Sequence, residues 1–174
     1  MLHRKTTLMD VLSLRKASGE VGGDIFVNGH PQEPNSFRRM TGYVEQFDVQ
    51  SPQLTVRETV EFSAKMRLEE SIPMETKLKF VDKVLAMLEL DSIAGFIVGD
   101  DTGGLSFEQK KRLSIAVELA ANPSCIFLDE PTSVSFVNTK SIKCLVNGLG
   151  VLILCKLSQL PLISNFQYTL GLGR

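Results

Sequence analysis

The sequence lacks an excess of charge of either sign. Its 19 lysine and arginine residues are balanced by 20 aspartate and glutamate residues, for a net charge of −1. Nucleic acids and anionic membrane surfaces attract proteins with a basic excess, so neither is expected as a partner. The chain also lacks an apolar run long enough to cross a bilayer. Asp10 interrupts the apolar part of the N-terminal segment, so we expect no secretory signal peptide.

Cysteine and histidine, the usual ligands of transition metals, are scarce. The three cysteines, Cys125, Cys144 and Cys155, show no CxxC or other metal-ligand spacing. Their odd number favours buried, reduced thiols of a cytosolic protein over a disulfide framework. His30 follows an Asn-Gly turn with no second ligand nearby, which predicts a surface residue. A chain of 174 residues suffices for one domain with its own core, or for part of a larger domain.

The most informative stretch runs from Gly103 to Glu130. Ser106 and Gln109 have the spacing of a capping box, in which each side chain bonds the backbone N–H of the other residue. This predicts a helix that starts after Ser106 and ends at Asn122-Pro123. Apolar residues recur along it at helical spacing: Leu113, Ala116, Val117 and Ala120. The helix is therefore expected to pack one face on the core.

A short apolar run, Cys125 to Leu128, follows and ends in Asp129 and Glu130. Such a run predicts a strand buried on both faces. Two carboxylates at the end of a buried parallel strand are costly unless they have a function, commonly magnesium binding and water activation. The preceding helix N-terminus suits a phosphate group. Together the two features indicate nucleotide hydrolysis.

This ordered pair of features resembles the signature motif and the Walker B motif of ATP-binding cassette (ABC) proteins. The segment LSFEQKKRLSIAVELAANPS is similar to the G-type, pleiotropic-drug-resistance transporters, specifically to the variant signature of their second nucleotide-binding domain. Phe107 and Glu108 replace the two glycines of the LSGGQ form. The resemblance covers about Lys5 to Ser133. It implies an α/β fold: a P-loop NTPase-like ABC ATPase core, incomplete, with an inserted α-helical subdomain at about residues 55–122.

The segment Lys5-Thr6-Thr7 resembles the back half of a Walker A loop, G-x-x-x-x-G-K-[ST]. The resemblance places Lys5 on the β- and γ-phosphates, Thr6 on magnesium and Thr7 at an additional phosphate contact. Arg4 stands in the position of the last glycine of the motif, and the first glycine of the chain is Gly19. We therefore interpret the segment as a truncated Walker A loop.

The resemblance also implies roles for residues later in the chain. Gln46 resembles the Q-loop residue, which contacts magnesium and the attacking water. Asp129 resembles the acid that holds magnesium, and Glu130 the general base for water. Ser106 and the group around it, including Gln109, resemble the element that completes ATP bound on an opposing cassette. The implied cofactors are ATP and Mg²⁺.

The other segments predict the framework around these residues. Residues 22–29 read as a short strand closed by an Asn-Gly turn, and Thr41 to Gln46 as a second buried strand. Thr55 and Glu58 form another capping box before a helix, and a second helix is expected from Met74 to Leu90. Two charged groups are expected on solvated helix faces: Lys77, Lys79, Asp82 and Lys83; and Lys110, Lys111 and Arg112. A phosphate or lipid patch is the alternative for the second group.

The resemblance stops after Ser133. Residues 134–174 contain neither the D-loop sequence nor the H-loop histidine of the family, although Val151 to Cys155 is a candidate strand. This tail is treated as divergent. An out-of-frame or intron-derived origin is one hypothesis for it.

We expect residues 1–133 to form a partial ABC nucleotide-binding domain, whose family couples ATP binding and hydrolysis to export. The implied partners are a second nucleotide-binding cassette and the transmembrane domains of a transporter, which place the domain at the cytoplasmic face of a membrane. One alternative is a catalytically disabled cassette fragment that acts at most as a docking partner. Another is a soluble ABC ATPase without a transport role. We expect the 174-residue chain alone to be inactive.

Overall fold

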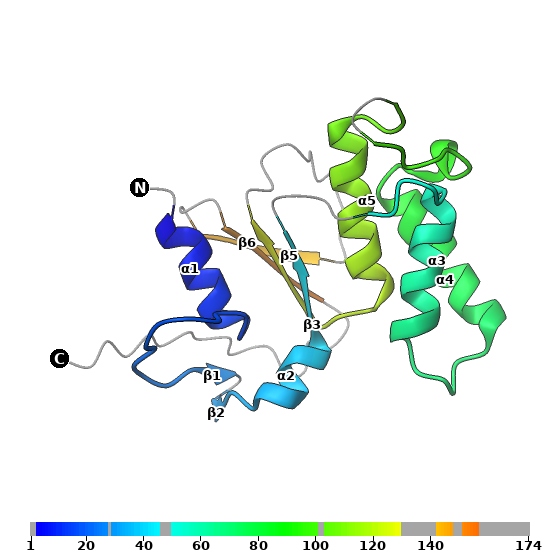
Figure 1. Cartoon of the computed structure of the whole chain (residues 1–174). Coiled ribbons are helices and arrows are strands. Elements are labelled where there is room, and N and C mark those ends of the chain that lie inside the picture. Colours follow the sequence, from blue (N-terminus) through cyan, green and yellow to red (C-terminus); the bar gives the residue numbers. More distant parts are fainter. Residues whose placement is uncertain are drawn as a thin grey trace.

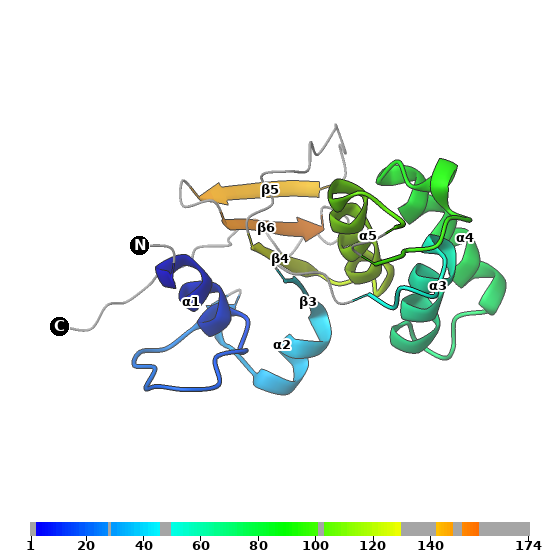
Figure 2. The ribbon, with the colours of Figure 1, turned by 45° about the horizontal axis from the view of Figure 1, so that its top comes forward.

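The computed structural model describes residues 3–27, 29–45, 50–100, 103–129, 142–147 and 151–156, with backbone only for 3–6, 129 and the last two segments. Its elements form three layers (Figures 1 and 2), with a sheet between α1 and α2 on one side and α3 to α5 on the other. Among the described residues, no helix is long and apolar enough to cross a membrane.

The central sheet is built on two parallel strands, β3 (Thr41–Val44) and β4 (Cys125–Asp129). Their register pairs Thr41 with Cys125 and Val44 with Leu128. The sequence-based prediction that these two apolar runs form strands is confirmed, and the two strands run parallel in one sheet. β6 (Val151–Lys156) then pairs antiparallel with β4, and β5 (Ile142–Asn147) antiparallel with β6, so the order is β3-β4-β6-β5. The candidate strand in the tail is therefore part of this sheet.

A small hairpin and two helices cover one face of the sheet. α1 (His3–Leu12) precedes β1 (Phe26–Val27) and β2 (His30–Pro31), which pair antiparallel around the expected turn. α2 (Pro34–Met40), which the sequence reading missed, begins at the N-cap Glu33, whose carboxylate accepts from the backbone N–H groups of Asn35 and Ser36. A proline in the first helical turn fits this start because the helix needs no N–H there.

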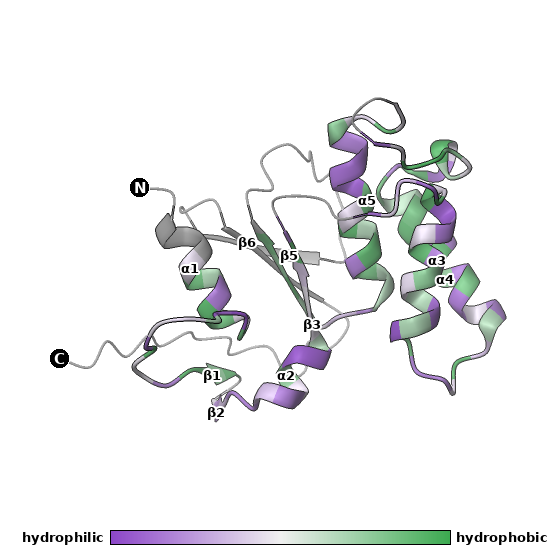
Figure 3. Cartoon of the chain, viewed as in Figure 1, coloured by the Kyte–Doolittle hydropathy of each residue, from purple (hydrophilic) through white to green (hydrophobic). Residues whose placement is uncertain are grey.

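The helical subdomain occupies the other face, as expected from the two capping boxes. It comprises α3 (Val56–Arg67), α4 (Met74–Met87), a short 3₁₀ turn η1 (Asp91–Ile93) and α5 (Phe107–Ala120). α4 ends three residues before the expected Leu90, because Glu89 takes a left-handed backbone conformation with φ 55°. In Figure 3, α5 changes from hydrophilic near its start to hydrophobic toward β4.

β4 separates two hydrophobic clusters because successive strand side chains point to opposite faces. Ile126 and Leu128 join the large cluster with Val60, Leu85 and Leu113 of the three long helices. On the other face, Cys125 and Phe127 pack with Met9 of α1 and Phe37 of α2. Burial of one large apolar side chain stabilises the fold by about 1.5–3 kcal/mol relative to leaving it exposed. The expectation of a buried Cys125 thiol is confirmed.

Two lysines expected in solvent are buried. Lys77 is 5% exposed and donates to the carbonyl oxygen of Leu68 at 3.2 Å. Lys111 is 3% exposed and donates to the carbonyl oxygen of Glu45 at 2.6 Å. In both cases the aliphatic stem packs inside while the ammonium bonds a carbonyl at the end of another element. The prediction was wrong for these two residues, whereas Lys79, Asp82 and Lys83 are exposed as expected.

Candidate functional site

The carboxyl ends of β3 and β4 and the N-terminal ends of α1 and α5 lie at the same end of the molecule (Figure 1). The parallel register places Val44 beside Leu128, so Asp129 and Glu45 lie at one edge of the sheet. In open α/β sheets, ligands bind at this carboxyl edge. The fold therefore creates a concentration of helix N–H groups and strand-end polar residues there.

The capping box at the start of α5 forms as predicted. The side-chain oxygen of Ser106 accepts from the backbone N–H of Gln109 at 3.3 Å, and the side-chain oxygen of Gln109 accepts from the N–H of Ser106 at 2.9 Å. Both side chains therefore satisfy backbone N–H groups at the start of α5. The remaining first-turn N–H groups give this terminus its positive character.

The two residues that replace signature glycines have different environments. The Phe107 side chain is 69% exposed. The Glu108 carboxylate lies 3.5 Å from Nη2 of Arg112, one turn further along α5. Because it is directed to an arginine on its own helix, its negative charge is partly compensated. This exposed ion pair contributes at most a few tenths of a kcal/mol to stability.

A tight loop before α5 sets the position of Ser106. The N–H of Leu105 donates to the carbonyl of Val98 at 3.0 Å, and Gly99 faces Gly104 in an antiparallel bridge. Both glycines have positive φ, 70° and 129°. A Cβ at Gly99 would lie 1.9 Å from the Gly103 carbonyl oxygen, so the two chain segments approach this closely only with glycine.

The proposed phosphate-binding residues lie at the beginning of α1. Lys5, Thr6 and Thr7 all fall within the helix, whereas the sequence analysis placed them in a loop before it, and Thr7 is exposed. The position of α1 is set by Met9, which is fully buried against Phe127 of β4. The side chains of Lys5 and Thr6 lie outside the described atoms.

The proposed magnesium and water ligands follow the two parallel strands. Asp129 is the last residue of β4, with only its backbone described, and Glu130 lies outside the described residues. Gln46, also outside the described residues, comes one residue after Glu45 at the end of β3. The described side chains contain no cluster of acids, histidines or cysteines that suits a metal ion. Of the predicted ligand set Thr6, Gln46 and Asp129, the structure describes the backbone of Thr6 and Asp129.

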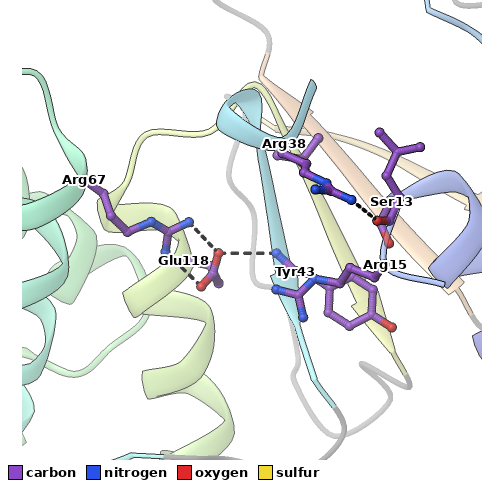
Figure 4. Close-up of a pocket in the computed structure, with 8 residues that line it drawn as sticks. Ser13, Arg15, Arg38, Tyr43, Arg67 and Glu118 are labelled. Carbon is purple, nitrogen blue, oxygen red and sulfur yellow. Dashed lines mark hydrogen bonds and ion pairs between the residues drawn. The ribbon is translucent and has the colours of Figure 1, made fainter. Parts of the chain in front are cut away.

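A polar hollow of about 610 Å³ lies at the other end of β3, beside Thr41 (Figure 4). Arg67 of α3 makes two hydrogen bonds of 2.9 Å to Glu118 of α5, which also accepts from the backbone N–H of Tyr43 at 3.3 Å. Arg15 lies 4.4 Å from the centre of the Tyr43 ring. These contacts tie α3, α5 and β3 together. The sequence analysis did not predict these contacts. The indication of them in the sequence is Glu118, an acid among the apolar residues of this helix.

A sheet with parallel strands, a helix N-terminus at its carboxyl edge and an inserted helical subdomain define a P-loop NTPase of the ABC ATPase type. The model of the ABC transporter family matches residues 5–133, about three quarters of the chain. The chain belongs to this family.

Similar proteins narrow the subfamily. ABC transporter G family member 31 of Arabidopsis thaliana is 56% identical over 130 residues, and member 51 of Oryza sativa subsp. japonica is 55% identical over 130. Each alignment covers 74% of this chain and 9% of the relative. Member 32 of Arabidopsis thaliana is 46% identical over 169 residues, covering 94% of this chain and 12% of that protein. The chain thus spans about a tenth of the length of these relatives.

The alignment with member 32 covers too much of the chain to end at Ser133, so similarity to this relative extends into the tail. Among solved structures, cbiO1 from Clostridium perfringens, part of the ABC transporter complex cbiONQ, matches with a TM-score of 0.55 and 24% identity. It covers 74% of this chain and 50% of that structure. This match supports the ABC ATPase fold.

Proposed function

We propose that the chain is part of an ATP-binding cassette that binds and hydrolyses Mg-ATP to drive export by a G-family ABC transporter. The observation that supports the proposal is the parallel pairing of β3 with β4, which brings Asp129 and Glu45, the residue before Gln46, to one sheet edge. The N-terminal end of α1 lies at the same end of the sheet (Figure 1). A phosphate and a magnesium ion both suit such an edge.

In this proposal Lys5 and Thr7 bind phosphate oxygens, and Thr6, Gln46 and Asp129 hold magnesium. Bound magnesium neutralises the charge of the phosphates and orients them. Glu130 accepts a proton from the attacking water. Ser106 and the first-turn N–H groups of α5, with Gln109 maintaining the cap, complete the nucleotide site of a second cassette. The transmembrane domains are the other partners, which places the cassette at the cytoplasmic face of a membrane.

A second proposal is that the cassette docks to its partner without turning over ATP. The observation that favours it is the start of α5, where exposed Phe107 and the acid Glu108 occupy the positions of two small residues. A bulky side chain and a negative charge both disfavour close approach of a phosphate group.

The deciding experiment compares Glu130→Gln with the unmodified residue in a full-length G-family transporter that carries this cassette. We expect Glu130→Gln to reduce ATP hydrolysis at least a hundredfold while ATP still binds, because the amide keeps the shape and removes the base. Glu75→Gln is the matched control, since Glu75 is an exposed α4 residue in a surface ion pair with Lys79. Unchanged hydrolysis in Glu130→Gln contradicts its catalytic role. Nucleotide binding without turnover in the unmodified transporter supports the docking proposal.

A further inference from the structure

Lys111 is a buried lysine of α5, which is called the signature helix below because it follows Ser106 of the signature motif. It lies at the boundary between this helix and the sheet. Its side chain is 3% exposed, and its Nζ donates to the carbonyl oxygen of Glu45 at 2.6 Å. Burying an ammonium group costs several kcal/mol unless it is hydrogen-bonded or paired with charge. A burial this complete therefore makes the position of the Glu45 carbonyl sensitive to Lys111.

The Glu45 carbonyl lies just beyond the last backbone pairing between β3 and β4. β3 is an edge strand of the described sheet, and its last register pair with β4 joins Val44 to Leu128. Glu45 comes directly after this pair. A backbone group beyond the ladder needs another partner, and here Lys111 of α5 supplies it.

α5 also holds β3 at Tyr43. Glu118, seven residues after Lys111, accepts from the N–H of Tyr43 and is clamped by Arg67 (Figure 4). Residues seven apart lie on one face of a helix, two turns and about 10 Å apart along its axis. α5 therefore bonds the chain at two points, Tyr43 within β3 and Glu45 directly after it, so a displacement of α5 displaces the end of β3.

The side chain of Glu45 is held from the opposite layer. Its carboxylate accepts from Nη1 of Arg15 at 2.8 Å, and Arg15 in turn lies over the Tyr43 ring. This ion pair is about half exposed, so solvent screens it and its energy is small. The buried Lys111 bond is therefore the stronger restraint on the backbone at this point.

We propose that Lys111 is a positioning residue that couples the signature helix to Gln46. The proposal rests on the proposed function, in which Gln46 contacts magnesium and water. The Glu45 carbonyl and the Gln46 N–H belong to one planar peptide group. Lys111 thus restrains the carbonyl side of the peptide group that leads to Gln46, and loss of this bond impairs the proposed role of Gln46.

The kinetic test uses Lys111→Met in the full-length transporter that carries this cassette. We expect kcat for ATP hydrolysis to fall roughly tenfold to a hundredfold, because Gln46 is no longer positioned correctly, while KM for ATP stays within about twofold. Lys111→Arg keeps a cation that reaches the carbonyl and is expected to restore most of kcat. Lys79→Met is the matched control, because Lys79 is an exposed lysine of α4. Equal kcat in Lys111→Met and the unmodified protein overturns the proposal.

A double-mutant cycle with Gln46→Ala separates positioning from a general structural role. If Lys111 acts through Gln46, Lys111→Met causes no further loss of kcat in the Gln46→Ala background. Losses that multiply overturn the proposal. If Lys111→Met does not fold, Lys111→Gln, which keeps a shorter polar side chain, replaces it in the same cycle with the same two outcomes.

An NMR arm is independent of catalysis. In the 174-residue chain, loss of the hydrogen bond to the Glu45 carbonyl is expected to shift the ¹⁵N resonance of Gln46 in Lys111→Met or Lys111→Gln, but not in Lys79→Met. An unshifted resonance overturns the proposal. The two experiments fail separately. If the resonance shifts in the 174-residue chain but the unmodified transporter hydrolyses no ATP, the proposed function is wrong while the Lys111 contact stands.

Discussion

At the scale of single residues, Gly42 in β3 allows α5 to approach the sheet. A Cβ at this position would lie 2.9 Å from Oε2 of Glu118 and 3.4 Å from Cγ1 of Ile126. Glu118 has little freedom to move away because Arg67 holds both of its oxygens. Gly42→Ala is therefore expected to lower the free energy of unfolding by about 1–3 kcal/mol, measured by urea denaturation.

Gly22→Ala is the control for this substitution, because a Cβ at Gly22 meets no atom within 4 Å. We expect its unfolding free energy to stay within about 0.5 kcal/mol of the unmodified chain. Equal stability of Gly42→Ala and Gly22→Ala would show that α5 and Glu118 adjust without cost.

A second prediction at this scale concerns the pH dependence of Glu58. The pKa of Glu58 is lowered by hydrogen bonds from the backbone N–H and the hydroxyl of Thr55. A carboxyl group with a lowered pKa in the folded state stabilises the fold above its ordinary pKa, and the contribution is lost as pH falls through the folded value. Glu58→Gln should therefore flatten the fall of Tm between about pH 6 and pH 3.

Thermal denaturation monitored by circular dichroism measures this slope. Glu70→Gln, at an exposed position between α3 and α4, is the comparison variant. A Glu58→Gln slope equal to that of Glu70→Gln would exclude a contribution of the capping carboxylate to acid sensitivity.

At the scale of the elements, the two capping boxes define where the helices of the subdomain begin. Ser106 caps α5 as Thr55 caps α3. Ser106→Ala removes one acceptor for the first-turn N–H groups and should destabilise the chain by about 1 kcal/mol in urea denaturation. Ser71→Ala is the control, because Ser71 lies in the segment between α3 and α4 and its hydroxyl donates to the exposed carboxylate of Glu69. If Ser106→Ala lowers the free energy of unfolding no more than Ser71→Ala does, the cap does not stabilise the chain.

At the scale of the whole molecule, a polypeptide of only these 174 residues is expected to turn over ATP at a rate near background. Arg4 stands where the phosphate loop needs a glycine, so few N–H groups converge on a phosphate. In the proposed function the site is also completed by a second cassette. Loss of one well-placed donor costs about a hundredfold or more in rate. Phosphate release from the 174-residue chain, compared with its Glu130→Gln variant, checks this; turnover that Glu130→Gln eliminates would contradict it.

The sequence by itself determined the local features of this protein. Both capping boxes, the helices of the subdomain, the short strand before Gly29 and the runs that form β3 and β4 follow from patterns within a few residues. Hydrogen bonds and apolar spacing inside a single turn or strand suffice to specify them. The family was recognisable for the same reason, since the signature and Walker B motifs are continuous in the chain.

Only the tertiary structure decided which polar groups are buried and what they contact. Lys77 and Lys111 have the sequence surroundings of solvated lysines, yet each bonds a carbonyl of another element. The clamp of Arg67 on Glu118 joins residues 51 positions apart, and β6 runs antiparallel beside β4. Such contacts depend on how elements pack across the sheet. Sequence spacing carries no information about them, because the partner that satisfies a buried charge lies far away in the chain.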